Sequence, residues 1–429
     1  MVHERSQGKR ALARFVLAVA LAGVLCGSLR PRQAFAAQSY VDRRVTALAP
    51  TALLHLPPAA LVDPRRQRAA VRFRRWTRPI FFFSALSQIV ALFLLWASGY
   101  GARLRDGLRS RIRPAYALRF AYGALLAVVA GVAELPASLV AYRFDAAYGL
   151  STATPLHWAR DGLLNNTVHA LLLGAVVTFI FALVDRTRLW YVWAMGGLFA
   201  LTLLMAFLEP VTVAPLYNHF KPLPHNSVVR APLIALARRA GIGNAPIEVA
   251  NFSVRSPAVV ADVAGFGPTK RIVLGDQLLT AATTGEVLFL AAREFGHYAH
   301  ADDFRLSLFW TFLFIVCAAL AVILADRTFV RRDDDPLARL SLVLAFLGLL
   351  GLAATPLYNG YLRNIESLAD AYALALTGDH VSAVRAYVRI ADETLSPLCP
   401  ARSVRLYFYN NPPLGTRIAA AQGGHNPCP

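Results

Sequence analysis

The sequence has few charged residues, and acidic residues are the scarcest of them. Only 16% of its 429 residues are charged, with 25 Asp and Glu against 44 Lys and Arg. Soluble domains contain about a quarter charged residues, whereas this chain is 56% hydrophobic with a mean hydropathy of +0.46. This composition argues against a soluble globular protein and predicts a membrane protein.

The shortage of acidic residues leaves a net charge of +19, which by itself would suit a nucleic-acid-binding protein. The arginines, however, cluster beside apolar stretches, where basic side chains contact anionic headgroups and help to set the topology. We therefore expect the lipid bilayer as a partner and no nucleic acid. The clearest cluster comprises Arg65, Arg66, Arg68, Arg72, Arg74, Arg75 and Arg78.

Cysteine is also rare, and no CxxC motif occurs, so a thiolate metal site is not predicted. Cys26 and Cys317 lie in apolar runs, as inert small hydrophobic side chains do. Cys399 and Cys428 lie in the polar C-terminal region. We expect them to form a disulfide if that region faces an oxidising compartment.

The N-terminus is typical of a secretory signal. Basic residues precede an apolar run from Phe15 to Leu29, and Ala34-Phe35-Ala36 offers a small-residue cleavage site. The alternative is an uncleaved signal anchor, which the arginines after the run, Arg30 and Arg32, favour. Residues 1–36 are thus predicted to be a signal peptide or a signal anchor.

Six further apolar stretches have close to the ~20 residues that cross a bilayer core. The fold class is therefore expected to be a mainly α, polytopic membrane protein with six or seven transmembrane helices. Glu134, late in the second stretch, indicates either a polar cavity inside the bundle or an interfacial position. The stretches are Pro79–Tyr100, Ala115–Leu139, Val168–Val184, Leu189–Leu208, Phe304–Ala325 and Ala338–Tyr358.

A polar region from Val211 to Asp303 separates the fourth and fifth of these stretches. It contains a helical pattern ended by Gly241 and Gly243, two short β-like runs, and a second helical pattern that begins near Thr284. Another helix is expected after the last stretch. We predict an N-terminal transmembrane domain at 37–210 and a second domain at 211–429. These elements are Ala231–Ala240, Ile247–Ala250, Ile272–Leu274 and Arg363–Leu376.

The segment from Arg293 to His297 is a degenerate HExxH motif. In the intact motif, two histidines four residues apart bind zinc from one helix face, and the glutamate activates a zinc-bound water. Here Glu294 and the second histidine are present, but arginine replaces the first histidine. Glu366 and Asp370, one turn apart on the later helix, suit a metal ligand and a residue that supports a ligand.

With these motifs in order, the sequence resembles the type I CAAX prenyl endoprotease family of integral-membrane zinc metallopeptidases, in its bacterial form. The resemblance implies a chamber enclosed by the membrane helices, a gluzincin-like metallopeptidase domain with a small β-sheet, and the bacterial inner membrane. It covers most of the chain. The matching segments are His55–Pro58, Pro215–Asn218, Lys221–Pro224, Gly265–Leu274, Asn359–Arg363, Glu366–Asp370, Asn411–Leu414 and Arg417–Ile418.

The resemblance also implies a role for each matching site residue. The zinc ligands would be the residue at position 293, His297 and Glu366, with Glu294 as general base and Asp370 orienting the first ligand. Asn411 stands where active members carry a histidine that assists the oxyanion. The strand that pairs with the substrate corresponds to Val260, Ala261 and Asp262, where the family has Asn-Ala-Tyr.

Arg293 is the departure with the largest physical consequence. A guanidinium has no acceptor lone pair, and about 5 Å from Zn²⁺ it is repelled by roughly 7 kcal/mol at an effective dielectric near 20. We therefore expect Arg293 to replace the charge of the metal by pairing with Asp370 and Glu366. Zinc is the family's cofactor, but this sequence is not expected to bind it tightly. His300 could act as a substitute ligand; the alternative is a helix-end histidine without a role.

These departures predict a catalytically impaired pseudoprotease that still binds peptides or membrane-protein segments. The alternative is an active zinc metalloendopeptidase with a remodelled metal site. A transporter or channel is a third reading, which the ordered motifs disfavour. Neither the natural substrate, nor the side of the membrane that the site faces, nor the oligomeric state follows from the sequence.

Overall fold

The computed structural model describes residues 34–328 and 335–428, so almost all of the expected signal segment, 1–36, lies outside the described residues. Six described helices are long and apolar enough to cross a membrane, which confirms a polytopic, mainly helical membrane protein. They are α5 (Pro64–Ala97), α7 (Ala115–Tyr148), α8 (Pro155–Arg186), α9 (Trp190–Thr212), α14 (Asp302–Thr328) and α15 (Pro336–Thr377).

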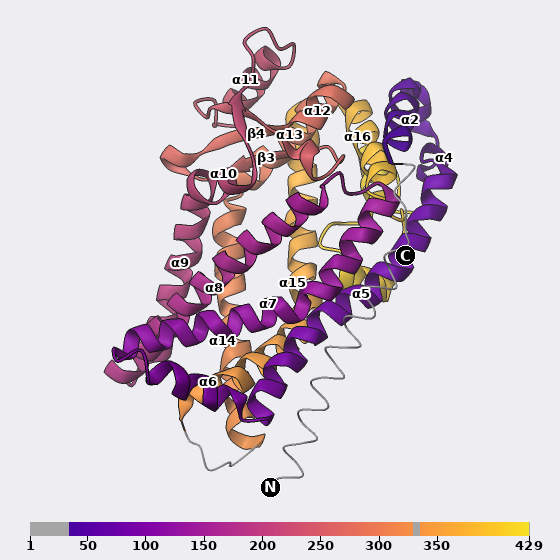
Figure 1. Cartoon of the computed structure of the whole chain (residues 1–429). Coiled ribbons are helices and arrows are strands. Elements are labelled where there is room, and N and C mark those ends of the chain that lie inside the picture. Colours follow the sequence, from indigo (N-terminus) through magenta and orange to yellow (C-terminus); the bar gives the residue numbers. More distant parts are fainter. Residues whose placement is uncertain (1–33, 329–334, 429) are drawn as a thin grey trace.

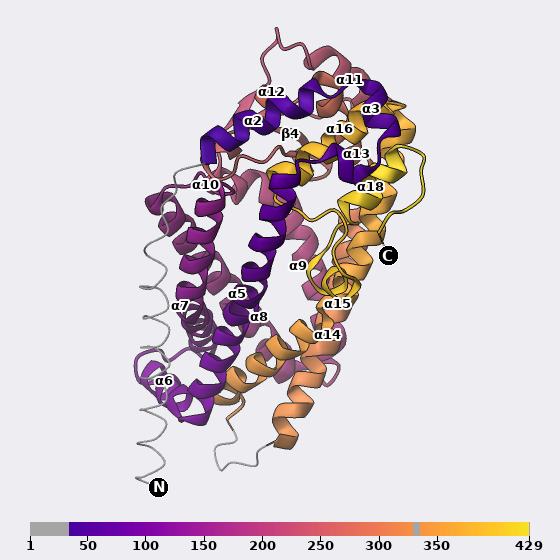
Figure 2. The same ribbon diagram turned by 90° about the vertical axis from the view of Figure 1, so that its right-hand side faces the viewer.

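The six spans close into a ring. Helix α5 packs against α7, α7 against α8, α8 against α9, α9 against α14, α14 against α15, and α15 returns to α5. The sheet and helices α11 and α12 cover one end of the ring, and α6 (Tyr100–Arg109) lies at the other end (Figures 1 and 2). The ring therefore has one end next to the polar region and one end away from it.

Helix α15 corrects one expectation. The predicted last span and the predicted helix Arg363–Leu376 are a single helix of 42 residues with Pro356 inside it. Asn359 and Gly360 do not end the helix. The Nδ2 of Asn359 donates instead to the carbonyl of Tyr407, 2.7 Å away, so this side chain is not available to cap the local backbone.

Helix α8 is also longer than predicted. It begins at Pro155, after Thr154, whose hydroxyl accepts a hydrogen bond from the amide of His157. A proline in the first turn and a threonine cap are standard helix-start features. The polar residues of the first turns hid this start from a search for apolar runs.

Glu134 in α7 faces a neighbouring helix. Its carboxylate accepts hydrogen bonds from Ser84 Oγ at 2.9 Å and from Gln88 Nε2 at 3.0 Å, both in α5. The bundle therefore contains polar contacts between spans, as expected for an ionisable group within a membrane helix.

The polar region contains a four-stranded mixed sheet in the order β1-β2-β4-β3. Strands β2 and β4 confirm the two predicted β-like runs. β1 and β2 are antiparallel, β2 and β4 parallel, and β4 and β3 antiparallel. Every residue of β4 is buried, so β4 is the central hydrophobic strand. The strands are β1 (Phe220–Pro222), β2 (Ile247–Ala250), β3 (Ala261–Ala264) and β4 (Arg271–Gly275).

Helix α13 (Thr284–Ala299) forms the centre of the polar region. It begins with a capping box in which Thr283 and Glu286 bond each other's backbone amides. It packs against β3, α15 and α16 (His380–Glu393), and Phe289 and Phe295 are fully buried in the shared core. The remaining elements are shorter: α2 (Ala34–Ala47), α3 (Pro50–His55), α4 (Pro58–Leu61), α10 (Ala214–Tyr217), α11 (Arg230–Arg239), α12 (Asp276–Ala281), α17 (Arg402–Phe408), α18 (Leu414–Ala421), and the 3-10 turns Phe252–Val254 and Gly267–Thr269.

A buried ion cluster joins α2, α13 and α16 at the start of α13. Arg389 is completely buried and bonds Glu286 at 2.9 Å, Asp42 at 2.6 Å and Glu393 at 3.4 Å. Burial raises the pKa of Glu393 to about 8, although Arg389 acts to lower it. We call Arg389 and these three carboxylates the core cluster.

Candidate functional site

Helices α13 and α15 pack closely because small residues meet between them. A Cβ atom added to Gly296 would lie 3.1 Å from the Tyr372 side chain and 3.2 Å from the Cα of Ala369. Gly296 thus lets the two backbones approach. This approach brings the degenerate motif on α13 next to the two acidic residues on α15.

Arg293 lies at the centre of this contact. Its Nε donates to Asp370 Oδ1 at 3.1 Å, its Nη1 to Glu294 Oε1 at 2.9 Å, and its Nη2 to Glu366 Oε2. The ion pairs expected with Asp370 and Glu366 are both present. The Arg293 side chain is 16% exposed, so the cluster remains in contact with solvent. We call Arg293 and these three carboxylates the site cluster.

Arg417 of α18 provides a second cation for Asp370. Its Nε and Nη2 donate to the two oxygens of Asp370 at 2.8 and 2.6 Å, and its guanidinium stacks over the Tyr387 ring at 4.4 Å. Its Nη1 also donates to Asn411 Oδ1 at 3.3 Å. Asp370 is therefore fixed by two guanidinium groups, in the bidentate manner that charge-assisted pairs favour.

His297 is held from both sides of its ring. Its Nδ1 lies 3.0 Å from Asp302 Oδ2 and its Nε2 lies 3.8 Å from Glu366 Oε1. Burial and the neighbouring Arg293 lower the pKa of His297, while Asp302 acts to raise it. The two residues expected to be ligands, His297 and Glu366, thus face each other.

The carboxyl group of Glu294 is less acidic than an ordinary carboxyl group. Burial raises its pKa to about 7, and the nearby carboxylate of Asp262 adds to the shift, whereas Arg293 lowers it. A carboxyl with a pKa near neutrality can act as a general base or a general acid. The position expected to hold the base therefore keeps a suitable proton affinity without a metal.

The expected substrate strand lies at the edge of the sheet. β3 pairs only with β4 within the described residues, and the carbonyl of Val260 just before it accepts from the amide of Gly275 at 2.8 Å. The Asp262 side chain is accessible to solvent, but the surrounding protein and the carboxylates of Glu209 and Asp303 raise its pKa to about 6. The free edge of β3 is suited to pair with an extended peptide.

The described residues do not fit a zinc site. Among them, no group of three or more His, Cys, Asp or Glu residues is arranged to hold a metal. Arg293 fills the position between the carboxylates, and His300 does not replace it. The ring of His300 packs against Tyr372 at the end of α13, with a buried Nδ1 that bonds no described residue.

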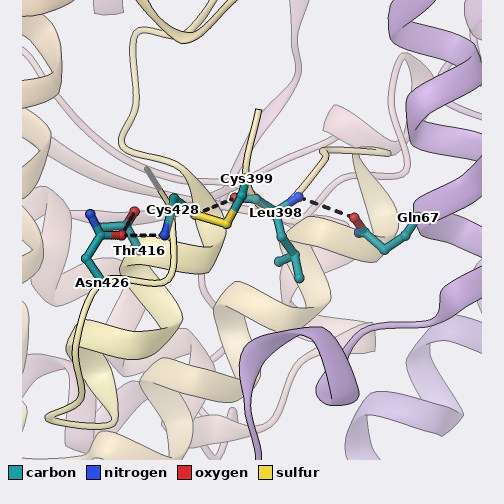
Figure 3. Close-up of a disulfide and its surroundings, with 6 residues drawn as sticks. All are labelled: Gln67, Leu398, Cys399, Thr416, Asn426 and Cys428. Atoms are coloured by element: carbon teal, nitrogen blue, oxygen red, sulfur yellow. Dashed lines mark hydrogen bonds between the residues drawn. A yellow bond between two sulfur atoms is a disulfide. The ribbon is translucent and has the colours of Figure 1, made fainter. Parts of the chain in front are cut away.

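A disulfide lies beside α18, the helix that carries Arg417 (Figure 3). Cys399 and Cys428 are bonded, with their Cα atoms 5.0 Å apart, which confirms the predicted pairing. Next to it, the amide of Leu398 donates to Gln67 Oε1 at 3.3 Å. The disulfide joins the segment before α17 to the segment after α18, and this hydrogen bond links the first of these segments to α5.

Sequence reasoning gave no role to two residues of the site, Arg417 and Asp302. Arg417 lies six residues after Asn411, in the last of the segments that match the family. The sequence therefore contained a signal for it. Asp302 lies five residues after His297, beyond the end of α13. Its contact with His297 depends on the turn into α14, and no sequence pattern revealed it.

A helical ring of membrane spans with a metallopeptidase-type helix pair defines the class of protein. Models of two families match the chain: the five-helix CAAX prenyl protease N-terminal region at residues 58–219, and peptidase family M48 at residues 225–424. The chain therefore belongs to the CAAX prenyl protease family of membrane metallopeptidases, as the sequence motifs indicated. The M48 family is zinc-dependent in general, and this chain is an integral membrane protein.

Individual relatives extend over nearly the whole chain. An uncharacterized metalloprotease, YhfN, of Bacillus subtilis is 26% identical over 86% of this chain and 88% of its own length. A CAAX prenyl protease 1 homolog of Arabidopsis thaliana is 27% identical over 90% and 94%. The crystal structure of S. mikatae Ste24p superposes with a TM-score of 0.72 at 21% identity, covering 95% and 98% of the two chains, so the two share a fold.

Proposed function

We propose that this protein is a catalytically impaired member of its family that binds peptides or membrane-protein segments. The observation that carries the proposal is the site cluster. One guanidinium contacts Glu294, Glu366 and Asp370 together, at the positions that the family resemblance assigns to metal chemistry. Because Arg293 supplies the positive charge that these carboxylates need, the fold is kept while the first metal ligand is lost.

The retained parts support binding of an extended chain. The edge of β3, which includes Ala261 and Asp262, is free to form backbone hydrogen bonds with a peptide. We place this edge in a 211–429 domain that adjoins a 37–210 membrane domain. The ring of spans adjoins the polar region, so segments of membrane proteins are the partners that best match this position. We propose a bacterial inner membrane as its location, because one relative that matches over 88% of its own length is bacterial.

Metal content and proteolysis of the purified protein test the proposal. We expect well below one zinc per chain and no chelator-sensitive cleavage of an unfolded protein substrate. A fluorescent, extended peptide should nevertheless bind saturably. The matched variant is Glu294→Gln, which removes the candidate base together with one of the three ion pairs of Arg293, and should leave both results unchanged.

The alternative function, an active peptidase with a remodelled metal site, predicts different results. The natural protein would then contain about one zinc per chain, as three-ligand catalytic sites do, and would cleave the substrate. Chelator and Glu294→Gln would both abolish cleavage. That combination would refute the impaired reading, and failure to bind any peptide would refute the binding role.

A further inference from the structure

A cavity of about 380 Å³ lies beside the site cluster, between α5, α13, α16, α18 and the segment that joins α17 to α18. Its wall contains three arginines, Arg74, Arg293 and Arg417, and no Asp or Glu among the described residues. The carboxylates that pair with Arg293 and Arg417 therefore do not line the cavity. The cavity presents cationic and neutral hydrogen-bonding groups to anything that enters it.

Arg74 differs from the other two arginines because no carboxylate bonds it in the described part of the chain. Its Nε is buried without a hydrogen-bond partner among the described residues, and its guanidinium lies 5.4 Å from the Phe73 ring. The hydroxyl of Tyr409, on the same wall, is also buried and bonds no described residue. Buried donors without a partner are unfavourable, and two that share a cavity point to a ligand that accepts from both.

We propose that this cavity, the anion pocket, binds the phosphate group of a small molecule or of a lipid headgroup. Arginine forks match phosphate oxygens, and phosphate accepts hydrogen bonds from several directions at once. The donors here come from separate elements: Arg74 from α5, Tyr409 and Asn410 from the segment after α17. The volume lies in the range of ligand pockets, roughly 300–1,000 Å³, and so exceeds what phosphate alone would fill.

Two sources of phosphate suit the position of the anion pocket. Arg74 belongs to the basic stretch of α5 that precedes its apolar part, and such stretches lie at the level of anionic headgroups. A lipid phosphate is therefore one source, and a soluble organic phosphate is the other. The inference does not depend on peptide binding or on proteolysis, so it stands or falls separately from the proposed function.

Binding of inorganic phosphate to the purified protein in neutral detergent tests the proposal, with chloride at equal ionic strength as reference. A second arm measures retained lipid by native mass spectrometry, comparing phosphatidylglycerol with a neutral galactolipid that lacks phosphate. We expect saturable binding in at least one arm. Arg74→Gln should weaken it about tenfold or more, because it removes charge-assisted hydrogen bonds.

Two further variants separate a specific pocket from general surface charge. Arg75→Gln removes the same charge from an exposed neighbour that does not line the cavity, and should leave the affinity unchanged. Tyr409→Phe removes one hydroxyl with little change of shape and should weaken binding about three- to tenfold. Equal effects of Arg74→Gln and Arg75→Gln, or no saturable binding of phosphate or phosphatidylglycerol, would overturn the proposal.

Discussion

Two arginines in this protein are each surrounded by three carboxylates, yet their environments differ. Both clusters include a residue of helix α13, Glu286 in one and Arg293 in the other. These two residues are seven positions apart and so lie on one face of the helix. Arg389 is completely buried, whereas the side chain of Arg293 is 16% exposed and borders a cavity. The core cluster is Arg389 with Asp42, Glu286 and Glu393, and the site cluster is Arg293 with Glu294, Glu366 and Asp370.

The comparison separates two uses of the same arrangement of charges. In the core cluster it stabilises the fold, and in the site cluster an arginine has been substituted at a functional position. Arg389 joins α2, α13 and α16, and nothing in the family motifs places a metal there. Arg293 joins α13 to α15 at the position that the family resemblance assigns to a zinc ligand. Water can reach the carboxylates of the site cluster, whereas Glu286 and Glu393 beside Arg389 are buried, so the two clusters should respond differently to the loss of their cation.

Removal of the cation from the core cluster should have the largest effect. Arg389→Met leaves Glu286 and Glu393 buried without their partner, which should lower the free energy of unfolding by about 3–5 kcal/mol. Chemical denaturation in detergent measures it. Arg385→Gln on the same helix breaks only a hydrogen bond to the carbonyl of Leu48 and should cost far less; equal losses would show that Arg389 is not a structural centre.

Removal of the disulfide should have a slightly smaller effect, on the side of the site cluster. Replacing Cys399 and Cys428 together with alanine opens a link across 29 positions of sequence and should destabilise by about 3–4 kcal/mol. Cys317→Ala, at the buried free cysteine, is the control. Alkylation of protein taken from its native membrane gives a further check, because two free thiols there would contradict both the pairing and an exported polar region.

Arg293→His should convert the site cluster into a metal site. The imidazole removes the cationic repulsion and joins His297 and Glu366 as a third ligand. At zinc concentrations about a hundredfold above the Kd, the variant should gain about 3 kcal/mol of stability, whereas Arg293→Gln should gain none. Metal analysis and thermal unfolding with and without chelator measure this, and a metal-free Arg293→His protein would show that the pocket has diverged beyond this position.

Activity should require more than the restored ligand. We expect chelator-sensitive cleavage only when Val260→Asn and Asn411→His accompany Arg293→His, because substrate pairing and oxyanion support contribute separately to the barrier. Cleavage by the single variant at the level of the triple variant would show that neither of the other two positions limits catalysis.

The pH dependence of stability should give the smallest effect. The folded-state pKa of Glu393 is raised to about 8 from an ordinary value of 4.5, so the folded protein holds a proton that the unfolded chain releases. Stability from this group is complete below about pH 4.5 and is lost as pH rises through 8. Between about pH 6.5 and 8 the natural protein should lose about 1–2 kcal/mol relative to Glu393→Gln; a constant difference would contradict the shift.

The sequence determined the membrane architecture because apolar composition acts over whole segments. Apolar runs such as Leu189–Leu208 and Phe304–Ala325 are unfavourable in water whichever segments pack beside them. Both are membrane spans in the structure. Segment ends were less accessible: α8 starts thirteen residues before the predicted Val168. Its first turns are polar, and a hydropathy pattern does not detect them.

The sequence by itself also determined which residue types occupy the motif positions, including the arginine at position 293, because the identity of a residue does not depend on the fold. Only the tertiary structure decided what they contact. The three-way pairing of Arg293 requires α13 and α15 to approach at Gly296, and the burial of Arg389 requires α2 and α16 to meet α13. The anion pocket likewise combines Arg74 with Tyr409, 335 positions later in the chain. Such contacts depend on the packing of distant segments, which local sequence patterns do not encode.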